Sequence, residues 1–515
     1  MSHATDLRGG YSAASRTAGP PAGSGSSASG QAGRPPGSWP VSAPIDVDPA
    51  SWPDVATVPR SPVRAAIARV LFARVAARLP LRVRLPTGAG FGGGGPGAPV
   101  LALHRPDDFC QRVGATGLIG FGESYMAGDW DADDLTGLLT VLARQVDRLV
   151  PRQLHWLRNA YVRRQPPGED ASETGARRNI QRHYDLSNEL FALFLDETMT
   201  YSSALFEQDS QGWPAASGAL PAGPAPAEAD LAAAQRRKID RLLDETRVGP
   251  GTSVLEIGTG WGELAIRAAQ RGARVRTVTI SAEQRELASR RVTEAGLADR
   301  VSIELLDYRR VDGQYDAIVS VEMIEAVAER YWPEYFAVLD RLLAPGGRIG
   351  LQAITMPHHR MLATRRTQTW ILKYIFPGGL IPSVTAIEAN LAAHTGLRVA
   401  DRRGFGRHYA ETLRLWRERL LARQGELAGL GFDEVFGRMW RLYLCYSEAG
   451  FRSGYLDVSQ FLLVPGRDEE AAPGRDDEAV PSQNGAAGDQ AAGDQAAGPD
   501  RDTGAGPGRD QRRAA

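Results

Sequence analysis

The chain of 515 residues carries 60 lysine and arginine side chains against 61 aspartate and glutamate side chains, a formal net charge of −1. This length accommodates two or three domains with a sizeable core, and the balanced charge excludes an overall basic surface for nucleic acid. The two cysteines, Cys110 and Cys445, lie far apart and outside any Cys/His cluster, so neither disulfides nor a metal site are expected and a reducing cytoplasm is the expected location.

Composition divides the chain into tails, folded units and one insertion. Residues 1–59 and 466–515 contain few large apolar residues and cannot offset the entropy of folding, so we expect disordered tails. Residues 211–228 are expected to be a flexible insertion. The folded units are a small N-terminal α+β domain over 60–170 and a larger domain over 175–465. No secretory signal or apolar run of about 18 residues is visible, so we expect a soluble protein or a peripheral one.

The first unit is expected to open with a helix over 63–75, because apolar residues recur there at helical spacing with arginines between them. Such a basic amphipathic helix either lies on an anionic membrane surface or packs on its own domain with its arginines in water. A Gly-rich turn over 92–95 and a mixed segment over 118–126 complete the unit.

The second unit alternates short apolar strands with helical segments. Strands are expected over 253–257, 274–280, 301–306, 315–320 and 348–353, and helices over 263–271 and 282–294. Strands that are separated by helices form βαβ units around a mostly parallel sheet. The pattern therefore predicts a doubly wound α/β domain.

The sharpest local signal is the turn after the first of these strands, where Gly258, Gly260 and Gly262 occupy alternate positions. Glycines let the backbone approach a ligand at the carboxyl end of a strand. The spacing lacks the third glycine of the GxGxxG pyrophosphate fingerprint, and Glu256 lies two residues before the first glycine. The turn resembles motif I of class I S-adenosylmethionine-dependent methyltransferases, which implies their Rossmann-like doubly wound sheet.

Polar residues follow the next two strands of the predicted sheet. Thr279 and Gln284 stand where a carboxylate usually takes the ribose hydroxyls of the cofactor, and Asp307 and Tyr308 are placed to bracket the adenine. Taken alone, each of these residues also fits a helix cap or a polar loop. We expect all four to contribute to the cofactor site.

Five further motifs occur in order in the second unit: His183–Asn188, Phe194–Ser203, Lys373–Gly379, His408–Leu413 and Phe451–Tyr455. Together they resemble the cyclopropane fatty acid synthase family. Members transfer the methyl group of S-adenosylmethionine to a cis double bond in an unsaturated acyl chain. The resemblance implies membrane phospholipid acyl chains as substrate, a place at the inner face of the membrane, and a lipid- or membrane-associated role for residues 60–170.

The resemblance also assigns roles to single residues. Tyr201 and Ser202 match the pair that closes over the cofactor, and Glu325 matches the active-site glutamate. Tyr409 matches the tyrosine that, with this glutamate, helps to hold a bicarbonate ion. Methyl transfer to an alkene depends on positioning and leaves a carbocation that aromatic faces such as tyrosines stabilise. Glu325, directly or through bicarbonate, is the expected base that removes the final proton.

The chain departs from the family pattern near this site. Ser203 and Ser447 stand where many members have cysteine, Gln352 where they have histidine, and Ala326 where a histidine commonly follows the glutamate. Some of these positions surround the bicarbonate. A neutral glutamine still donates hydrogen bonds to an anion, so the exchange at Gln352 is compatible with anion binding.

The fate of the carbocation decides the product. Proton loss from the new methyl group closes a cyclopropane, whereas a hydride shift followed by proton loss leaves an exocyclic methylene. Residues 200–204 and 322–326 look like those of actinobacterial relatives that make 10-methylene fatty acids on the way to tuberculostearic acid, which favours the methylene. That product requires a separate reductase, because the chain shows no second dinucleotide fingerprint.

Three alternatives stay open from the sequence. A cyclopropane-fatty-acyl-phospholipid synthase shares most of the motifs. A methyltransferase for a soluble small molecule shares the glycine turn but leaves the motifs at 183–185 and 374–379 without a role. A non-catalytic lipid- or cofactor-binding protein agrees with the exchanged residues, but the intact Glu325 and Tyr409 argue against it.

Overall fold

The computed structural model describes residues 45–145, 187–207 and 225–466. The C-terminal tail, most of the predicted insertion and the first 44 residues lie outside these ranges, as does most of the 183–188 motif. Within the described ranges, no helix combines the length and the apolar character that crossing a membrane requires.

Residues 45–59 correct the predicted boundary of the N-terminal tail. They contain a short helix, α1 (Pro53–Ala56), and the side chain of Val55 is 1% exposed. The guanidinium of Arg112 donates hydrogen bonds to the carbonyl oxygens of Asp54, Val55 and Thr57. Disorder was wrongly expected for this stretch, because its few apolar side chains complete a core that other segments form.

The N-terminal unit contains a four-stranded sheet in the order β2-β1-β3-β4 with helices packed around it. The helix expected over 63–75 is present as α2. The elements are α2 (Pro62–Ala76), β1 (Arg82–Arg84), β2 (Gly90–Phe91), β3 (Val100–Leu103), α3 (Pro106–Thr116), α4 (Leu118–Met126), β4 (Trp130–Ala132) and α5 (Leu135–Arg144).

Helix α4 contains two glycines because other parts of the chain approach it closely. A Cβ atom added at Gly120 would lie 2.0 Å from the carbonyl oxygen of Arg112, and one at Gly122 would lie 2.2 Å from Cδ1 of Trp370. The glycines made this segment look mixed in the sequence. They weaken the helix intrinsically and permit the contact with Trp370.

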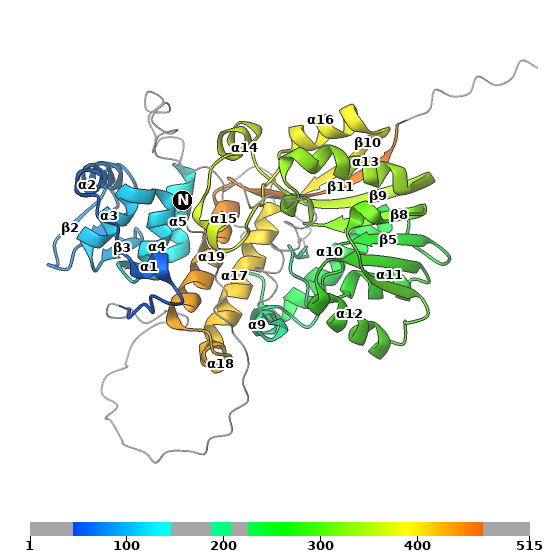
Figure 1. Ribbon diagram of the computed structural model, residues 1–515, viewed down its shortest axis with the longest axis horizontal. Coiled ribbons are helices and arrows are strands. Elements are labelled where there is room, and N and C mark those ends of the chain that lie inside the picture. The colour runs from blue at the N-terminus through cyan, green and yellow to red at the C-terminus, as the bar shows by residue number, and fades with distance from the viewer. Residues whose placement is uncertain (1–44, 146–186, 208–224, 467–515) are drawn as a thin grey trace, which may run out of the picture. The chain divides into compact units, whose positions relative to one another are not determined.

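The larger sheet has seven strands in the order β10-β11-β9-β8-β5-β6-β7 (Figure 1). Strands β9, β8, β5, β6 and β7 pair in parallel, whereas β11 pairs antiparallel with both β9 and β10. The sequence predicted the five parallel strands and missed the antiparallel pair. Their bounds are β5 (Ser253–Ile257), β6 (Arg274–Thr279), β7 (Val301–Leu305), β8 (Tyr315–Val321), β9 (Leu343–Thr355), β10 (Leu397–Gly404) and β11 (Asp457–Pro465).

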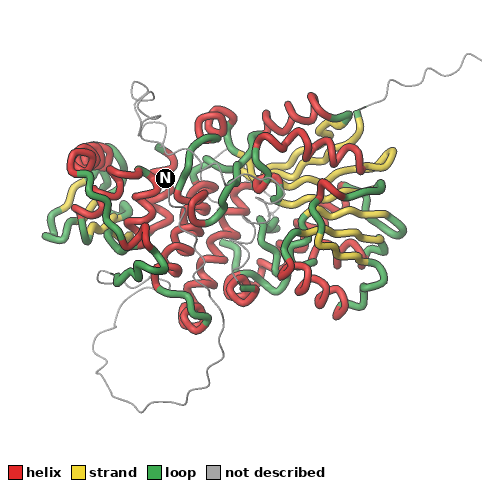
Figure 2. Tube along the Cα trace, viewed as in Figure 1, coloured by secondary structure: helices red, strands yellow, loops and turns green. Residues whose placement is uncertain are grey.

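Helices cover both faces of this sheet (Figure 2). On β8, Ala317 and Val319 pack into one hydrophobic cluster while Ile318 packs into another, as alternating side chains of a strand must. This confirms the doubly wound α/β fold. The helices of this part are α9 (Asn188–Phe194), α10 (Leu231–Glu245), α11 (Glu263–Gln270), α12 (Ala282–Glu294), α13 (Trp332–Leu342), α14 (His358–Thr364), α15 (Trp370–Tyr374), α16 (Val384–His394), α17 (Gly406–Ala422), α18 (Gln424–Gly429) and α19 (Glu434–Arg452).

Helices α17 and α19 connect the sheet to the N-terminal unit. Helix α19 packs against α4, α5 and α17, and one hydrophobic cluster contains residues of both units, such as Leu138 and Trp440. Arg438 on α19 pairs with Asp131 at 2.9 Å. The two predicted units therefore share a core.

We predict that Gly122→Ala lowers the stability of the protein. The added methyl group would overlap the rigid indole of Trp370, and overpacking of this kind costs about 1–3 kcal/mol. Gly425→Ala is the matched control, because a Cβ on that helical glycine meets nothing within 4 Å. Thermal unfolding should show a lower Tm for the first variant and an unchanged or slightly higher Tm for the second; equal Tm values would contradict the close contact.

Candidate active site

One cavity of about 1660 Å³ is lined by the carboxyl ends of the parallel strands and by helices of the N-terminal unit. Sites for a single small ligand usually span about 300–1,000 Å³, so this cavity has room for two ligands. Its polar wall contains Glu256, Thr279, Gln284, Asp307, Glu322 and Glu325, and its apolar wall contains Ile67, Leu71, Phe72, Leu139, Leu142 and Phe376.

Two of the three predicted glycines present their backbone to this cavity. Gly258 and Gly260 line it, both with positive φ (98° and 52°), and a Cβ on Gly260 would meet nothing within 4 Å. Gly262 precedes α11 and is not among the lining residues. A Cβ there would lie 3.2 Å from the Cβ of Ala288, so Gly262 allows the turn before α11 to approach α12 closely.

Glu256 places a buried carboxylate beside this turn. It is 4% exposed, and Oε2 has no hydrogen-bond partner among the described residues. Burial raises its pKa to about 8 against the opposing effects of Thr277 and Lys238. An unpartnered acceptor beside open glycine backbone fits a ligand that carries hydrogen-bond donors or positive charge, as S-adenosylmethionine does.

The polar residues after β6 and β7 also line the cavity. Thr279 Oγ1 donates to Gln284 Oε1 at 3.0 Å. The carboxylate of Asp307 accepts from the backbone and guanidinium of Arg309. These bonds outweigh the effect of burial and lower the pKa of Asp307. The structure therefore brings the four predicted residues to one wall, with Asp307 already paired.

Tyr201 and Ser202 lie on the same cavity, between α9 and α10 in the chain. The hydroxyl of Tyr201 lies 2.7 Å from that of Tyr443. Ser202 Oγ accepts from Lys238 Nζ at 2.5 Å. Lys238 is 1% exposed, and burial lowers its pKa to about 8. Sequence reasoning missed Lys238, because α10 contains several basic residues and the sequence does not indicate which of their side chains is buried.

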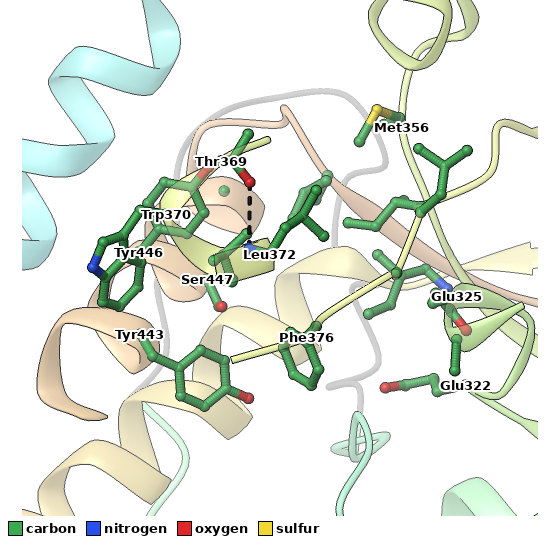
Figure 3. A pocket seen from close by; sticks show the side chains of 18 of the residues that line it. Glu322, Glu325, Met356, Thr369, Trp370, Leu372, Phe376, Tyr443, Tyr446 and Ser447 are labelled. Atoms are coloured by element: carbon green, nitrogen blue, oxygen red, sulfur yellow. Dashed lines mark hydrogen bonds between the residues drawn. The ribbon is translucent and has the colours of Figure 1, made fainter. Parts of the chain in front are cut away.

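Two glutamates after β8 form the remaining polar part of the wall. Glu325 Oε1 accepts from the backbone N–H of Ile354, while Oε2 is buried without a partner among the described residues. Burial and the nearby Glu322 raise the pKa of Glu325 to about 8. Figure 3 shows both glutamates on one side of the cavity and Trp370, Tyr443 and Tyr446 on the other.

Glu322 has three hydrogen-bond donors around its carboxylate. Oε1 accepts from the backbone N–H of Ser203 at 3.0 Å and from Gln352 Nε2 at 2.8 Å, and Oε2 accepts from the hydroxyl of Tyr409 at 2.7 Å. Gln460 Nε2 donates to Gln352 Oε1 at 3.0 Å, which turns the Gln352 amide nitrogen toward the glutamate. Sequence reasoning did not single out Glu322. The feature that could have indicated it is the presence of a second acidic residue in the short motif that contains Glu325.

Comparison with known proteins decides the family. A model described as mycolic acid cyclopropane synthetase matches residues 171–461. The chain belongs to the mycolic acid cyclopropane synthetase family. This confirms the sequence-based assignment to the cyclopropane synthase family, the class I methyltransferase fold and an enzyme that uses S-adenosylmethionine as methyl donor.

Relatives of this family cover most of the chain. The tuberculostearic acid methyltransferase UfaA1 of Mycobacterium tuberculosis is 61% identical over 426 residues, or 82% of this chain and 97% of the relative. The cyclopropane-fatty-acyl-phospholipid synthase of Escherichia coli is 34% identical over 72% of this chain and 89% of its own length. The solved cyclopropane synthase MmaA2 from Mycobacterium tuberculosis is 31% identical, with 56% of this chain and 97% of that chain covered and a TM-score of 0.48.

We predict opposite effects of Glu256→Gln on stability and on cofactor binding. The folded protein raises the pKa of Glu256 to about 8, whereas an unfolded glutamate has a pKa of about 4.3. Folding thus favours the protonated form, and the wild type loses stability as the pH rises from about 4 to 8. At pH 8 the ligand-free variant should have the higher Tm.

The same variant should bind S-adenosylhomocysteine about tenfold more weakly, equivalent to ~1.4 kcal/mol, because the charged acceptor is lost. Calorimetric titration measures this affinity. Glu294→Gln, on the exposed part of α12, is the control and should change neither quantity. An unchanged affinity for the Glu256 variant would remove this residue from the cofactor site.

Proposed function

We propose that this enzyme adds a one-carbon unit from S-adenosylmethionine to the cis double bond of an oleoyl-type acyl chain in a membrane phospholipid. The product is a 10-methylene acyl chain, the precursor of 10-methyl lipids of the tuberculostearate type, and a separate reductase completes the conversion. The observation that carries the proposal is a single cavity that joins a polar wall at the sheet edge to an apolar wall in the N-terminal unit. The 61% identity to a tuberculostearic acid methyltransferase supports the product.

The apolar wall fits an acyl chain. Leu71, Phe72, Leu139 and Leu142 come from helices of the N-terminal unit and line the same cavity as Glu322 and Glu325. Each methylene group that leaves water contributes about 0.8 kcal/mol. Burial of the chain therefore provides most of the binding free energy and excludes water from the double bond.

In this proposal S-adenosylmethionine supplies the methyl group, and the chain's own residues position the alkene and stabilise positive charge. Tyr201, Tyr409 and Phe376 all line the cavity. Tyr409 stacks on Phe451 with a centroid distance of 4.5 Å, which fixes its ring. Each desolvated aromatic face stabilises a cation by roughly 2 kcal/mol. Tyr201, Tyr409 and one of the two glutamates after β8 are the proposed catalytic residues.

The proposal includes contact with the inner face of the membrane through the N-terminal unit, residues 60–145 of the described chain. Helix α2 exposes Val63 (72%), Ile67 (46%), Val70 (49%) and Leu71 (47%), which share one helical face. Ile67 and Leu71 also line the cavity. A helix that rests on the bilayer with this face would lie next to an entrance for the acyl chain.

A direct assay separates the proposed product from a cyclopropane. Purified protein is incubated with S-adenosylmethionine and oleoyl phospholipid, and the released fatty acids are analysed by mass spectrometry and proton NMR. A gain of one carbon with vinylidene protons supports the proposal. High-field ring protons would instead make the enzyme a cyclopropane synthase, the activity named for the Escherichia coli relative. No gain of carbon would overturn the proposed substrate.

We predict that the double variant Val63→Glu/Val70→Glu binds anionic phospholipid vesicles at least tenfold more weakly, because burial of each side chain contributes about 1.5–3 kcal/mol. Neither residue lines the cavity, so turnover of lipid in detergent micelles should persist. Leu430→Glu is the matched control, since Leu430 is 41% exposed and lies at the end of α18. Vesicle flotation measures binding; equal flotation of both variants would refute membrane contact through α2.

A further inference from the structure

The carboxylate of Glu322 occupies the centre of an anion site. Its three donors come from three separate segments: Ser203 after α9, Gln352 on β9 and Tyr409 on α17. These are positions at which family resemblance places a bicarbonate ion or its surroundings. The carboxylate of Glu322 already accepts the hydrogen bonds of all three donors. A side chain of the protein therefore occupies the place of the bound anion.

The backbone at Glu322 points to the same conclusion. Its φ is +50°, in the left-handed region that favours glycine and costs other residues about 1–2 kcal/mol. The backbone N–H of Glu322 donates to the carbonyl oxygen of Gln352 at 2.8 Å, which holds the strained conformation. Strained backbone conformations of this kind cluster at functional sites, and the side chain of Glu322 lines the cavity.

The surrounding charges keep Glu322 available as a base. Burial raises its pKa, and the Ser203 N–H, Lys238, Tyr409 and Gln352 oppose that rise. Within the described ranges Glu325 has no comparable set of donors, and the nearby Glu322 helps to raise the pKa of Glu325 to about 8. Of the two carboxyl groups, Glu322 is therefore the one whose charged form is stabilised by a set of hydrogen-bond donors.

We infer that Glu322 is the base of the reaction, in place of a bound bicarbonate and in place of Glu325. This inference rests on the proposed function. Oε1 receives two of the three hydrogen bonds and Oε2 receives one, so Oε2 keeps acceptor capacity toward the cavity.

The proton balance of the step is simple. After methyl transfer and the hydride shift, the acyl chain carries a positive charge on the carbon that bears the new methyl group. A C–H bond of that methyl group breaks, and its electron pair forms the exocyclic double bond. The proton passes to Oε2 of Glu322, which becomes neutral, and the proton leaves to water after the product departs.

Three variants test this assignment in bicarbonate-free buffer. Wild-type turnover should not change when bicarbonate is added. Glu322→Ala should lose at least 100-fold in kcat, and bicarbonate or formate should restore it at least tenfold, because the vacated donors can bind a small anion. Glu322→Gln should be equally slow without rescue, since its amide fills the site. Glu325→Gln should retain more activity than Glu322→Gln.

Binding experiments distinguish variants that are inactive because they misfold from variants that are inactive because they lack the base. All variants should bind S-adenosylhomocysteine as the wild type does, and Glu426→Gln, at an exposed position of α18, should match the wild type throughout. The ¹³C NMR signal of bicarbonate should broaden with Glu322→Ala and not with the wild type. This readout needs no turnover.

Two results would overturn the inference: bicarbonate stimulation or bicarbonate binding of the wild type, or a Glu322→Gln variant that keeps more than a tenth of wild-type kcat. A wild type that does not methylate oleoyl phospholipid would instead contradict the proposed function. In that case the NMR comparison still decides whether Glu322 fills the anion site.

Discussion

The buried charges of helix α19 hold the two halves of the cavity together. Arg438 pairs with Asp131 and donates to the carbonyl oxygens of Tyr125 and Trp130 in the N-terminal unit. Toward its other end, Glu448 accepts from Arg417 and Arg452. Breaking a buried pair by removing one partner costs about 3–5 kcal/mol, so this helix has little freedom to shift. Because α19 is fixed, the apolar wall of the cavity keeps its position relative to the carboxyl ends of the strands.

Three carboxyl groups lie close to one another on the polar wall of the cavity. They belong to Glu256, Glu322 and Glu325, and the buried Lys238 counters the charge of the first two. Burial of these carboxyl groups disfavours their charged forms in the ligand-free protein, which is why their pKa values are raised. The group of three acids favours a positively charged donor and a positively charged reaction intermediate. The site is thus matched to charge that arrives with the ligands.

Sequence patterns predicted the elements that depend on local periodicity. Strand β5 and helix α12 begin and end where expected, because turn residues and caps bound them. The antiparallel strands β10 and β11 were missed, since their pairing joins segments about sixty residues apart without a short-range signal. Residues 45–59 and Lys238 were missed for a related reason: their burial depends on partners elsewhere in the chain. Motif resemblance located Tyr201 and Tyr409 on the cavity, but only the tertiary structure shows that Tyr409 bonds to Glu322.

The residues that line the cavity come from two separate stretches of the sequence. The family model covers residues 171–461, which hold the reacting groups, whereas Leu139, Leu142 and the lining residues of α2 lie before that range. Part of the apolar wall is therefore encoded before the range that holds the reacting groups, whereas Phe376 and Leu442 contribute to the same wall from within that range. Substitutions at Leu139 or Leu142 can thus change the shape of the apolar wall without altering any of the reacting groups.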